Sequence, residues 1–403
     1  MIPFSPPRTD QKTVDAVKEV LLSGWITSGP KTKEFETKLG DYCGNAATVC
    51  LNSATAGLEL VLRWFGVGPG DEVIVPVYTY CATANVVEHC GATPVFVDVN
   101  AHDFNISVKN VEAAITAKTK VIIPVDFAGF PCDYDELNNL VNKESVKAKF
   151  IANSLEQEQL GRILVLSDAA HSFGALYYGT KAGTLCDISV FSFHAVKNLT
   201  TAEGGAVALN LSAPFNNNEI AASLKVASLH GQTKDALSKT QLGAWEYDVI
   251  TAGYKCNMTD IQSAIGLVEL ERYDSETLPA RKRIFDLYTQ LLSSYTWAEL
   301  PAYEIDTKVS SYHLFPLRIK GVNYEQRNKI IEEISKKEVA VNVHFKPLPL
   351  LTYYKNKGHK IDDFPVAYDN FSREISLPVY FGLNDEQVKT VVRVLLDAVE
   401  KAL

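Results

Sequence analysis

Short apolar segments alternate with amphipathic segments over residues 53–209 of this chain. Apolar residues in the amphipathic segments recur with the helical period, and the apolar segments have the length and β-branched content of buried strands. Strands that alternate with helices form a mainly parallel sheet with helices on both faces. The predicted fold class is therefore α/β, with a large domain built on a mainly parallel, doubly wound sheet. The expected strands are residues 73–77, 95–99, 121–125, 163–167 and 188–193, and the expected helices lie near residues 53–65, 83–90, 108–115 and 131–141.

This regular alternation ends near residue 250. Two long amphipathic helices are expected at residues 258–273 and 279–292, and Asn384 with Gln387 resembles a capping box that opens a last helix. We therefore expect three parts: a proline-rich N-terminal arm over residues 1–12, a large domain over residues 13–255, and linker helices with a small carboxyl-terminal α+β domain over residues 256–403.

The composition limits which binding partners and which cellular compartment are expected for this protein. A net charge of −9 over 403 residues argues against nucleic-acid binding, which needs a basic face. The first residues lack the pattern of a secretion signal, and no apolar run approaches the roughly 20 residues that cross a bilayer. The seven cysteines are scattered without a C-x-x-C pair, so we expect reduced thiols in the cytoplasm and no metal site.

Three polar side chains follow two of the expected strands. Asp168 and His171 come at the end of strand 163–167, and Lys197 follows strand 188–193. Ligands of open α/β sheets bind beyond the carboxyl ends of the strands, so these side chains should converge on one crevice. Pyridoxal phosphate requires such a set, with an amine that bonds the cofactor and a carboxylate that keeps its ring nitrogen protonated. Each residue alone has an ordinary alternative: a solvated loop lysine, a helix-capping aspartate or a core histidine.

Motifs along nearly the whole chain resemble those of the DegT/DnrJ/StrS family. That family consists of fold-type-I, pyridoxal-phosphate-dependent aminotransferases that act on nucleotide-linked keto-sugars. The resemblance implies the same fold, the same cofactor and the same class of reaction here. The matching stretches are GWITSGP (24–30), NSATA (52–56), GPGDEV (68–73), DAAH (168–171), FSF (191–193), KN (197–198), GYKCNM (253–258), SSYHLF (310–315) and VH (343–344).

The resemblance implies roles for four residues around the cofactor ring. Lys197 would hold the cofactor covalently and then move a proton at the reacting carbon, for which its neutral amine is needed. Its pKa is therefore expected to be depressed beside the cationic ring. Asp168 would lie against the ring nitrogen, His171 near the ring or its phenolate oxygen, and Tyr80 stacked on the ring.

Five further residues are expected at the cofactor phosphate. Ser53, Ala54 and Thr55 start a helix, where free backbone amides and the helix dipole favour an anion. By resemblance, this helix start and the Thr55 hydroxyl bind the phosphate, with help from Ser192. Asn257, in a looser match to its family motif, would reach the phosphate of a neighbouring subunit. The expected assembly is therefore a homodimer with shared active sites.

Substrate contacts rest on the resemblance alone. Thr27, His230 and His344 occupy positions where relatives line the sugar and nucleotide side of the pocket. The expected reaction moves an amino group from L-glutamate to a nucleotide-diphospho-4-keto-6-deoxy sugar. Carbon four is favoured because LHGQTKD (229–235) and YKCNM (254–258) resemble that subgroup.

Other functions are possible for a chain with this predicted fold. A nicotinamide enzyme would need a G-x-G-x-x-G turn after a strand, and the sequence has none. A 3-keto sugar aminotransferase stays open as an alternative. A sugar dehydratase of the same family would carry histidine at the position of Lys197. A non-catalytic regulatory protein with the same fold would not need to retain Lys197, Asp168 and Ser192 together.

Overall fold

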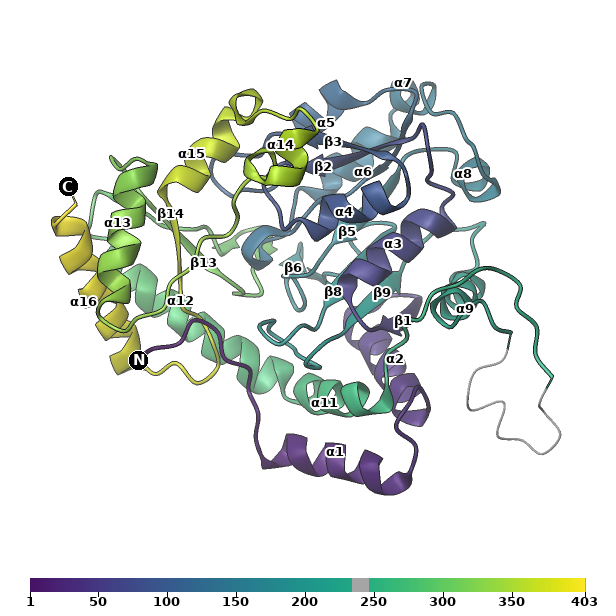
Figure 1. Cartoon of the computed structure of the whole chain (residues 1–403), viewed down its shortest axis with the longest axis horizontal. Helices are drawn as coiled ribbons and strands as arrows, with labels where there is room; N and C mark the ends of the chain where they lie inside the picture. The colour runs from purple at the N-terminus through teal and green to yellow at the C-terminus, as the bar shows by residue number, and fades with distance from the viewer. Residues whose placement is uncertain (234–245, 403) are drawn as a thin grey trace.

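Seven strands form the central sheet of the computed structural model, which describes residues 1–233 and 246–402 (Figure 1). Strands β8, β5, β4, β2 and β3 are mutually parallel, and β9 runs antiparallel to both of its neighbours, β8 and β1. The prediction of a mainly parallel sheet is confirmed. In spatial order the strands are β1 (Ala47–Leu51), β9 (Gly205–Leu209), β8 (Ile188–Ser192), β5 (Leu164–Asp168), β4 (Thr119–Ile122), β2 (Glu72–Pro76) and β3 (Thr93–Val97).

Apolar clusters and helices cover both faces of this sheet. Val73 and Val75 of β2 belong to one cluster and Ile74 between them belongs to the other, as the alternation of side chains along a strand requires. Burial on both faces explains why these strands are continuously apolar in the sequence. Helices α3 (Ala54–Trp64), α4 (Ala82–His89) and α9 (Asn217–Ser228) contribute to the first cluster, and α2 (Pro30–Cys43), α5 (Val108–Ala114) and α6 (Tyr134–Asn142) contribute to the second.

Strand β1 and helices α2 and α9 of this layer were not predicted from the sequence. Strand β1 precedes the expected helix start at Ser53, and α2 begins at Pro30, the last residue of the GWITSGP stretch. Proline is favoured in the first turn of a helix because its missing N–H has no partner there in any case. The polar stretch before β5 forms two short helices, α7 (Glu144–Lys147) and α8 (Leu155–Leu160).

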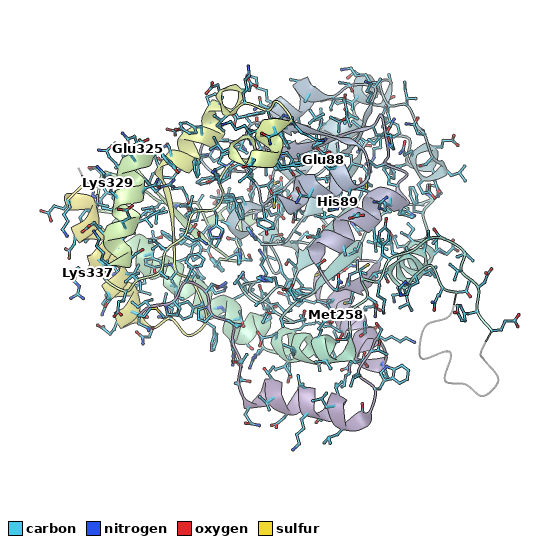
Figure 2. The ribbon with its side chains drawn as sticks, viewed as in Figure 1. Glu88, His89, Met258, Glu325, Lys329 and Lys337 are labelled. Atoms are coloured by element: carbon cyan, nitrogen blue, oxygen red, sulfur yellow. The ribbon has the colours of Figure 1, made fainter. Side chains whose placement is uncertain are left out.

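A third apolar cluster surrounds a three-stranded antiparallel sheet near the carboxyl terminus. The capping box is confirmed, since the Asn384 side chain accepts a hydrogen bond from the Gln387 backbone N–H and the Gln387 side chain accepts one from the Asn384 backbone N–H. Figure 2 shows Glu325 and Lys329 on the exposed side of α13. The elements around this cluster are β10 (Ala298–Glu299), β13 (Phe315–Ile319), β14 (Glu374–Leu377), α12 (Leu278–Leu292), α13 (Tyr324–Ser335) and α16 (Asp385–Glu400).

Long helices and short segments join these two regions. Helices α11 and α12 confirm the two predicted amphipathic helices, and a π-helical turn over Tyr273–Thr277 separates them. Within residues 1–233 and 246–402, no helix has the length and apolarity that a membrane crossing requires. The remaining elements are α1 (Gln11–Ser23), α11 (Asp260–Glu271), α14 (Thr352–Asn356), α15 (Pro365–Arg373) and a small sheet of β11 (Glu304–Ile305), β12 (Lys308–Val309), β6 (Leu176–Tyr177) and β7 (Thr180–Lys181).

The N-terminal segment crosses from the small sheet region to the large sheet. The backbone N–H of Ile2 donates to the Glu338 carbonyl at 2.8 Å, and the N–H of Ala340 donates to the Ile2 carbonyl at 2.9 Å. The guanidinium of Arg8 lies 3.9 Å from the centroid of the Phe381 ring. Between these two attachments, Phe4 and Ser5 line the cavity that is described below.

Candidate active site

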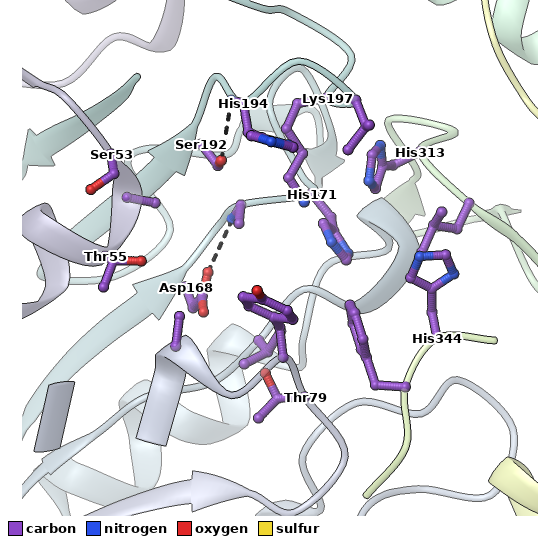
Figure 3. Close-up of a pocket in the computed structure, with 18 of the residues that line it drawn as sticks. Ser53, Thr55, Thr79, Asp168, His171, Ser192, His194, Lys197, His313 and His344 are labelled. Carbon is purple, nitrogen blue, oxygen red and sulfur yellow. Dashed lines mark hydrogen bonds between the residues drawn. The ribbon is translucent and has the colours of Figure 1, made fainter. Parts of the chain in front are cut away.

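A cavity of about 480 Å³ lies at the carboxyl ends of β5 and β8, bounded by the start of α3. Figure 3 shows Ser53 and Thr55 on one side of it and His344 on the other, with Asp168 and Lys197 between them. The structure therefore brings together nine of the residues singled out in the sequence: Ser53, Ala54, Thr55, Tyr80, Asp168, His171, Ser192, Lys197 and His344.

Lys197 lies in the loop that connects β8 to β9. Backbone hydrogen bonds close this loop at its base, from Phe193 N–H to the Gly204 carbonyl at 2.8 Å and from Thr201 N–H to the Phe193 carbonyl at 2.8 Å. The Lys197 side chain extends into the cavity (Figure 3). Burial lowers the pKa of Lys197 to about 8, although the nearby Asp168 carboxylate acts in the opposite direction. A substantial neutral fraction of this amine is therefore present near neutral pH.

Asp168, the last residue of β5, is buried. The Thr83 hydroxyl donates to its Oδ2 at 2.8 Å, and the Ala170 backbone N–H donates to its Oδ1 at 3.3 Å. Burial raises the pKa of Asp168, while the Thr83 hydrogen bond and the Lys197 charge oppose that rise. The carboxylate is thus fixed in position, and a cationic N–H group placed against it would favour its charged form.

The N-terminus of α3 forms the wall opposite His344. Ser53 caps this helix by accepting a hydrogen bond from the Ala56 N–H at 3.1 Å, and Ser53, Ala54 and Thr55 of the helix start line the cavity. A side chain at Gly205 would place its Cβ 2.4 Å from the Ala54 nitrogen, so glycine lets β9 approach the helix start. Together with Ser192, these groups form an anion-binding wall.

A buried histidine pair lines the cavity beside Lys197. The rings of His171 and His313 have centroids 4.3 Å apart. His313 Nδ1 lies 2.8 Å from Asn198 Oδ1, which also accepts a hydrogen bond from Arg281 Nε at 2.9 Å. Burial lowers the pKa of both histidines well below the usual value, so both rings are neutral. The Nδ1 atom of His171 is buried and makes no hydrogen bond to the described residues.

Aromatic side chains form the remaining wall. Phe4 stacks on His344 with ring centroids 5.5 Å apart and an interplanar angle of 22°. Phe345 lies between His171 and Tyr80, with centroids 5.8 Å and 6.0 Å away respectively. The Tyr80 side chain is largely exposed, so its ring is open to a ligand that enters the cavity.

Three predicted site residues lie outside the cavity lining. The Thr27 carbonyl accepts a hydrogen bond from the Asp260 N–H at 3.1 Å, and Asn257 donates to the Ser28 hydroxyl at 2.7 Å. The exposed His230 donates its backbone N–H to the Tyr254 carbonyl at 2.6 Å. Residues 234 and 235 of the 229–235 stretch lie outside the described residues.

Several residues of the site were not singled out in the sequence. Thr83 positions Asp168, His313 packs on His171, and the N-terminal segment supplies Phe4 and Ser5. The Ser5 hydroxyl donates to the Val196 carbonyl at 3.3 Å, directly before Lys197. Of these residues, only His313 could have been found in the sequence. It lies in the SSYHLF motif, which matches the family, although no role was assigned to it.

The donor set of the cavity fits pyridoxal phosphate. An anion-binding helix start with Ser192 fits the phosphate, Lys197 fits the aldehyde, and Asp168 fits the ring nitrogen. The unpartnered Nδ1 of His171 leaves one buried polar atom for the cofactor ring substituents. The cofactor would bring an electron-withdrawing ring that stabilises negative charge on the reacting carbon.

Comparisons with known proteins agree with this fit. The sequence profile of the DegT/DnrJ/EryC1/StrS aminotransferase family matches residues 7–396. A proposed sugar aminotransferase, Spr1654 from Streptococcus pneumoniae, is 49% identical in its PMP-form, with all of both chains covered and a TM-score of 0.96. Helicobacter pylori PseC, an aminotransferase of pseudoaminic acid biosynthesis, is 28% identical with 99% of each chain covered and a TM-score of 0.86. The spore coat polysaccharide biosynthesis protein SpsC of Bacillus subtilis is 34% identical over 100% of this chain and 98% of its own length.

These similarities test the predicted fold, enzyme class and cofactor. The pneumococcal relative is also known in a PLP-form, whose TM-score to this chain is 0.95 at 47% identity. The predicted fold type, the aminotransferase class and the dependence on pyridoxal phosphate are confirmed. The profile match spans nearly the full length, and the residues of the cavity agree with it. The chain belongs to the DegT/DnrJ/EryC1/StrS aminotransferase family.

Proposed function

We propose that this protein is a cytoplasmic sugar aminotransferase that transfers the amino group of L-glutamate to a nucleotide-diphospho-4-keto-6-deoxy sugar. The product would be an amino sugar used in the synthesis of a surface polysaccharide or glycan. The observation that carries the proposal is the convergence of Lys197 and Asp168 on one cavity, opposite an anion-binding helix start. All seven cysteines are free thiols, which supports the cytoplasmic location.

Lys197 acts as the base in this account. With a pKa of about 8, roughly one amine in ten is neutral at pH 7, against about one in three thousand at the usual value of 10.5. In each half of the reaction the neutral amine would take a proton at the reacting carbon, and the resulting ammonium would deliver that proton again, so that Lys197 ends each half without a net proton. The burial of Lys197 thus serves proton transfer in both directions.

Asp168 acts by its negative charge. Its oxygens accept hydrogen bonds from Thr83 and Ala170, which hold the carboxylate in place. With the cofactor bound, this fixed carboxylate would keep a proton on the ring nitrogen and so supply the electron-withdrawing character of the ring. The neutral rings of His171 and His313 add no positive charge to the cavity wall.

The sugar substrate is supported by the relatives. Spr1654 is described as a sugar aminotransferase, and SpsC as a protein of spore coat polysaccharide biosynthesis. In this chain the aromatic wall of Phe4, Tyr80 and Phe345 offers apolar surface, and His344 offers a polar ring at its edge. An apolar wall with a few polar groups suits a deoxy sugar that carries both a methyl group and hydroxyls.

Two other reactions of the family stay as alternatives. A 3-keto sugar aminotransferase would use the same residues and differ in the orientation of the sugar. A dehydratase is disfavoured because Lys197 extends into the cavity where those relatives carry histidine. A non-catalytic role is disfavoured because the Lys197 pKa is shifted towards neutral pH, which a purely structural lysine does not need.

The test is to supply the amino donor with heavy nitrogen. Purified protein is incubated with ¹⁵N-amino L-glutamate and a panel of UDP-, dTDP- and GDP-linked 3-keto and 4-keto sugars, and the products are read by mass. We expect a 4-keto sugar to gain the labelled amino group, and Lys197→Ala protein to give none. Label in a 3-keto sugar alone would favour the alternative, and no labelled sugar from any substrate would contradict the proposal.

A further inference from the structure

A buried chain of hydrogen bonds leads from the cavity wall to a carboxyl group that the reaction does not use. His344 Nδ1 lies 2.8 Å from the Ser376 hydroxyl, and Ser376 in turn lies 2.5 Å from Glu374 Oε1. The other carboxyl oxygen, Oε2, accepts the His344 backbone N–H at 3.0 Å. Glu374 and Ser376 belong to β14, and both are fully buried.

The sheet fixes this chain in place. Ser376 pairs with Asn342 through two backbone hydrogen bonds of 2.8 and 3.2 Å, which hold the segment before His344 against β14. The Tyr78 hydroxyl donates to the His344 carbonyl at 2.7 Å. Among the described residues, no partner bonds the second ring nitrogen of His344, Nε2, and the ring lines the cavity.

The Ser376 hydroxyl has one proton, and this couples the protonation of Glu374 to the position of the proton on the His344 ring. A charged Glu374 can only accept, so Ser376 donates to it and must accept a hydrogen bond from Nδ1–H of His344. In that state Nε2 has no proton and is an acceptor. A protonated Glu374 instead donates to Ser376, which donates to Nδ1, and Nε2 then carries the proton and is a donor.

His344 stays neutral in both states. Burial and the Lys197 charge lower the pKa of His344 to about 3, so only the position of its one ring proton changes. The protonation state of Glu374 therefore determines which of the two states forms.

No cation binds the Glu374 carboxyl directly in the described structure. Arg327 of α13 donates to the backbone carbonyls of Phe371 and Glu374 at 2.8 and 2.6 Å, and Arg318 of β13 pairs with Glu299 at 2.7 Å. Tyr78 is the other titratable group close to Glu374, and its hydroxyl donates to the His344 carbonyl and not to the Glu374 carboxyl. Burial therefore dominates and raises the pKa of Glu374 to about 8, against the smaller effects of Ser376, His344, Arg327 and Arg318.

We propose that Glu374 is a positioning residue that acts through Ser376 to decide which nitrogen of His344 carries the proton, and hence whether His344 donates or accepts a hydrogen bond in the cavity. Near neutral pH, the protonated carboxyl makes His344 a donor. A donor there suits a substrate oxygen that carries no proton, such as a carbonyl, carboxylate or phosphate oxygen. This inference rests on the proposed function in so far as the cavity is the substrate site.

The test reads the tautomer of His344 directly. The full-length holoenzyme is labelled with ¹⁵N-histidine, the His344 signals are assigned with the His344→Asn variant, and the imidazole nitrogen shifts are followed from pH 6 to pH 9.5. We expect Nε2–H at low pH and a change to Nδ1–H as the pH passes about 8. In Glu374→Gln, whose amide can donate at every pH, the ring should stay Nε2–H throughout.

Three control variants separate the effect of these hydrogen bonds from general effects on the fold. Glu299→Gln removes a carboxylate that does not belong to the His344–Ser376–Glu374 hydrogen bonds, and it should keep the wild-type change of tautomer. Ser376→Ala should disconnect His344 from Glu374, and Ser376→Thr should restore the connection because threonine keeps the hydroxyl. Circular dichroism and cofactor absorbance verify that each variant is folded and loaded.

Kinetics provide a second readout. In wild type the KM of the sugar acceptor should rise about tenfold above pH 8, because one hydrogen-bond donor is lost, whereas in Glu374→Gln the KM should stay level. The profile of kcat, which depends on Lys197, should be the same in both. A wild-type ring that keeps one tautomer over the range, or a Glu374→Gln ring that changes as wild type does, would overturn the proposal. The spectra require no turnover, so either result leaves the proposed reaction untouched.

Discussion

At the scale of single residues, burial does most of the chemical tuning in this site. It lowers the pKa of Lys197 to about 8 and those of His171 and His313 well below the usual value, while it raises that of Asp168. The charges of Lys197 and Asp168 oppose these effects on each other. The site is thereby provided with a lysine that can lose its proton and histidines that do not compete for it.

The lowered Lys197 pKa predicts the pH dependence of the first half-reaction. The base is the neutral amine, so the single-turnover rate with L-glutamate should fall about tenfold for each pH unit below about 8 and level off above it. Stopped-flow absorbance of the bound cofactor between pH 5.5 and 9.5 measures this rate. A rate that is level down to pH 6 would mean that Lys197 is not the titrating base.

Asp168→Asn tests the role of the carboxylate charge. The amide keeps the shape and the Thr83 contact but cannot hold a proton on the ring nitrogen, so turnover should fall by about a hundredfold or more, equivalent to about 3 kcal/mol of barrier. Cofactor retention, measured by absorbance after gel filtration, should persist. Asp126→Asn is the matched control, since Asp126 is equally buried and hydrogen-bonded but does not line the cavity. Turnover within a few-fold of wild type in Asp168→Asn would assign Asp168 a structural role only.

At the scale of elements, strand ends and helix starts determine the site. Asp168 and Lys197 could be predicted because each follows a strand that the sequence pattern identifies locally. The functions of Thr83, His313 and Phe4 could not, because each depends on a contact with a residue far away in the chain, such as Phe4 with His344. Helix α2 was not predicted for a local reason: it begins at Pro30, and a stretch with glycine and proline is as typical of a loop as of a helix start.

The N-terminal arm is an element whose contribution the sequence did not reveal. Phe4 stacks on His344, and the neighbouring Ser5 bonds to the carbonyl of Val196. Phe4→Ala should therefore raise the KM of the sugar acceptor by about fivefold, consistent with about 1 kcal/mol for an aromatic contact, and leave cofactor retention unchanged. Phe4→Tyr, which keeps the ring, should remain close to wild type. Equal KM values for Phe4→Ala and wild type would show that the arm does not contribute to the substrate site.

At the scale of the whole molecule, the placement of Asn257 concerns assembly. Asn257 bonds to Ser28 within its own chain and does not line the cavity. Large apolar side chains are exposed in the segments that precede Ser28 and Asn257 in the sequence: Leu21, Leu22, Ile26, Tyr247, Val249, Ile250 and Tyr254. Exposed apolar residues in such number support an interface, and we propose the isologous homodimer in which Asn257 serves the partner's site. The division into an arm, a large domain to residue 255 and a small carboxyl-terminal domain stays a prediction.

Mixing two inactive variants tests the shared site. Lys197→Ala spoils the site of its own subunit, whereas Asn257→Ala should weaken the cofactor phosphate contact in the site of the other subunit. Exchanged heterodimers should therefore recover one intact site and up to about half of wild-type activity per dimer, because one of two equivalent sites is restored. Equilibrium sedimentation of wild type should give a dimer. An active monomer, or no recovery in confirmed heterodimers, would contradict the shared site.

We expect Lys197 to be the residue that bonds the cofactor and carries the reaction. The most direct measurement is to treat the holoenzyme with borohydride, digest it and locate the added cofactor mass by tandem mass spectrometry. We expect a yellow protein whose reduced cofactor is attached to the peptide that contains Lys197, and a colourless, unlabelled Lys197→Ala protein that is still folded. Attachment to any other lysine, or amination at the wild-type rate by Lys197→Ala, would contradict it.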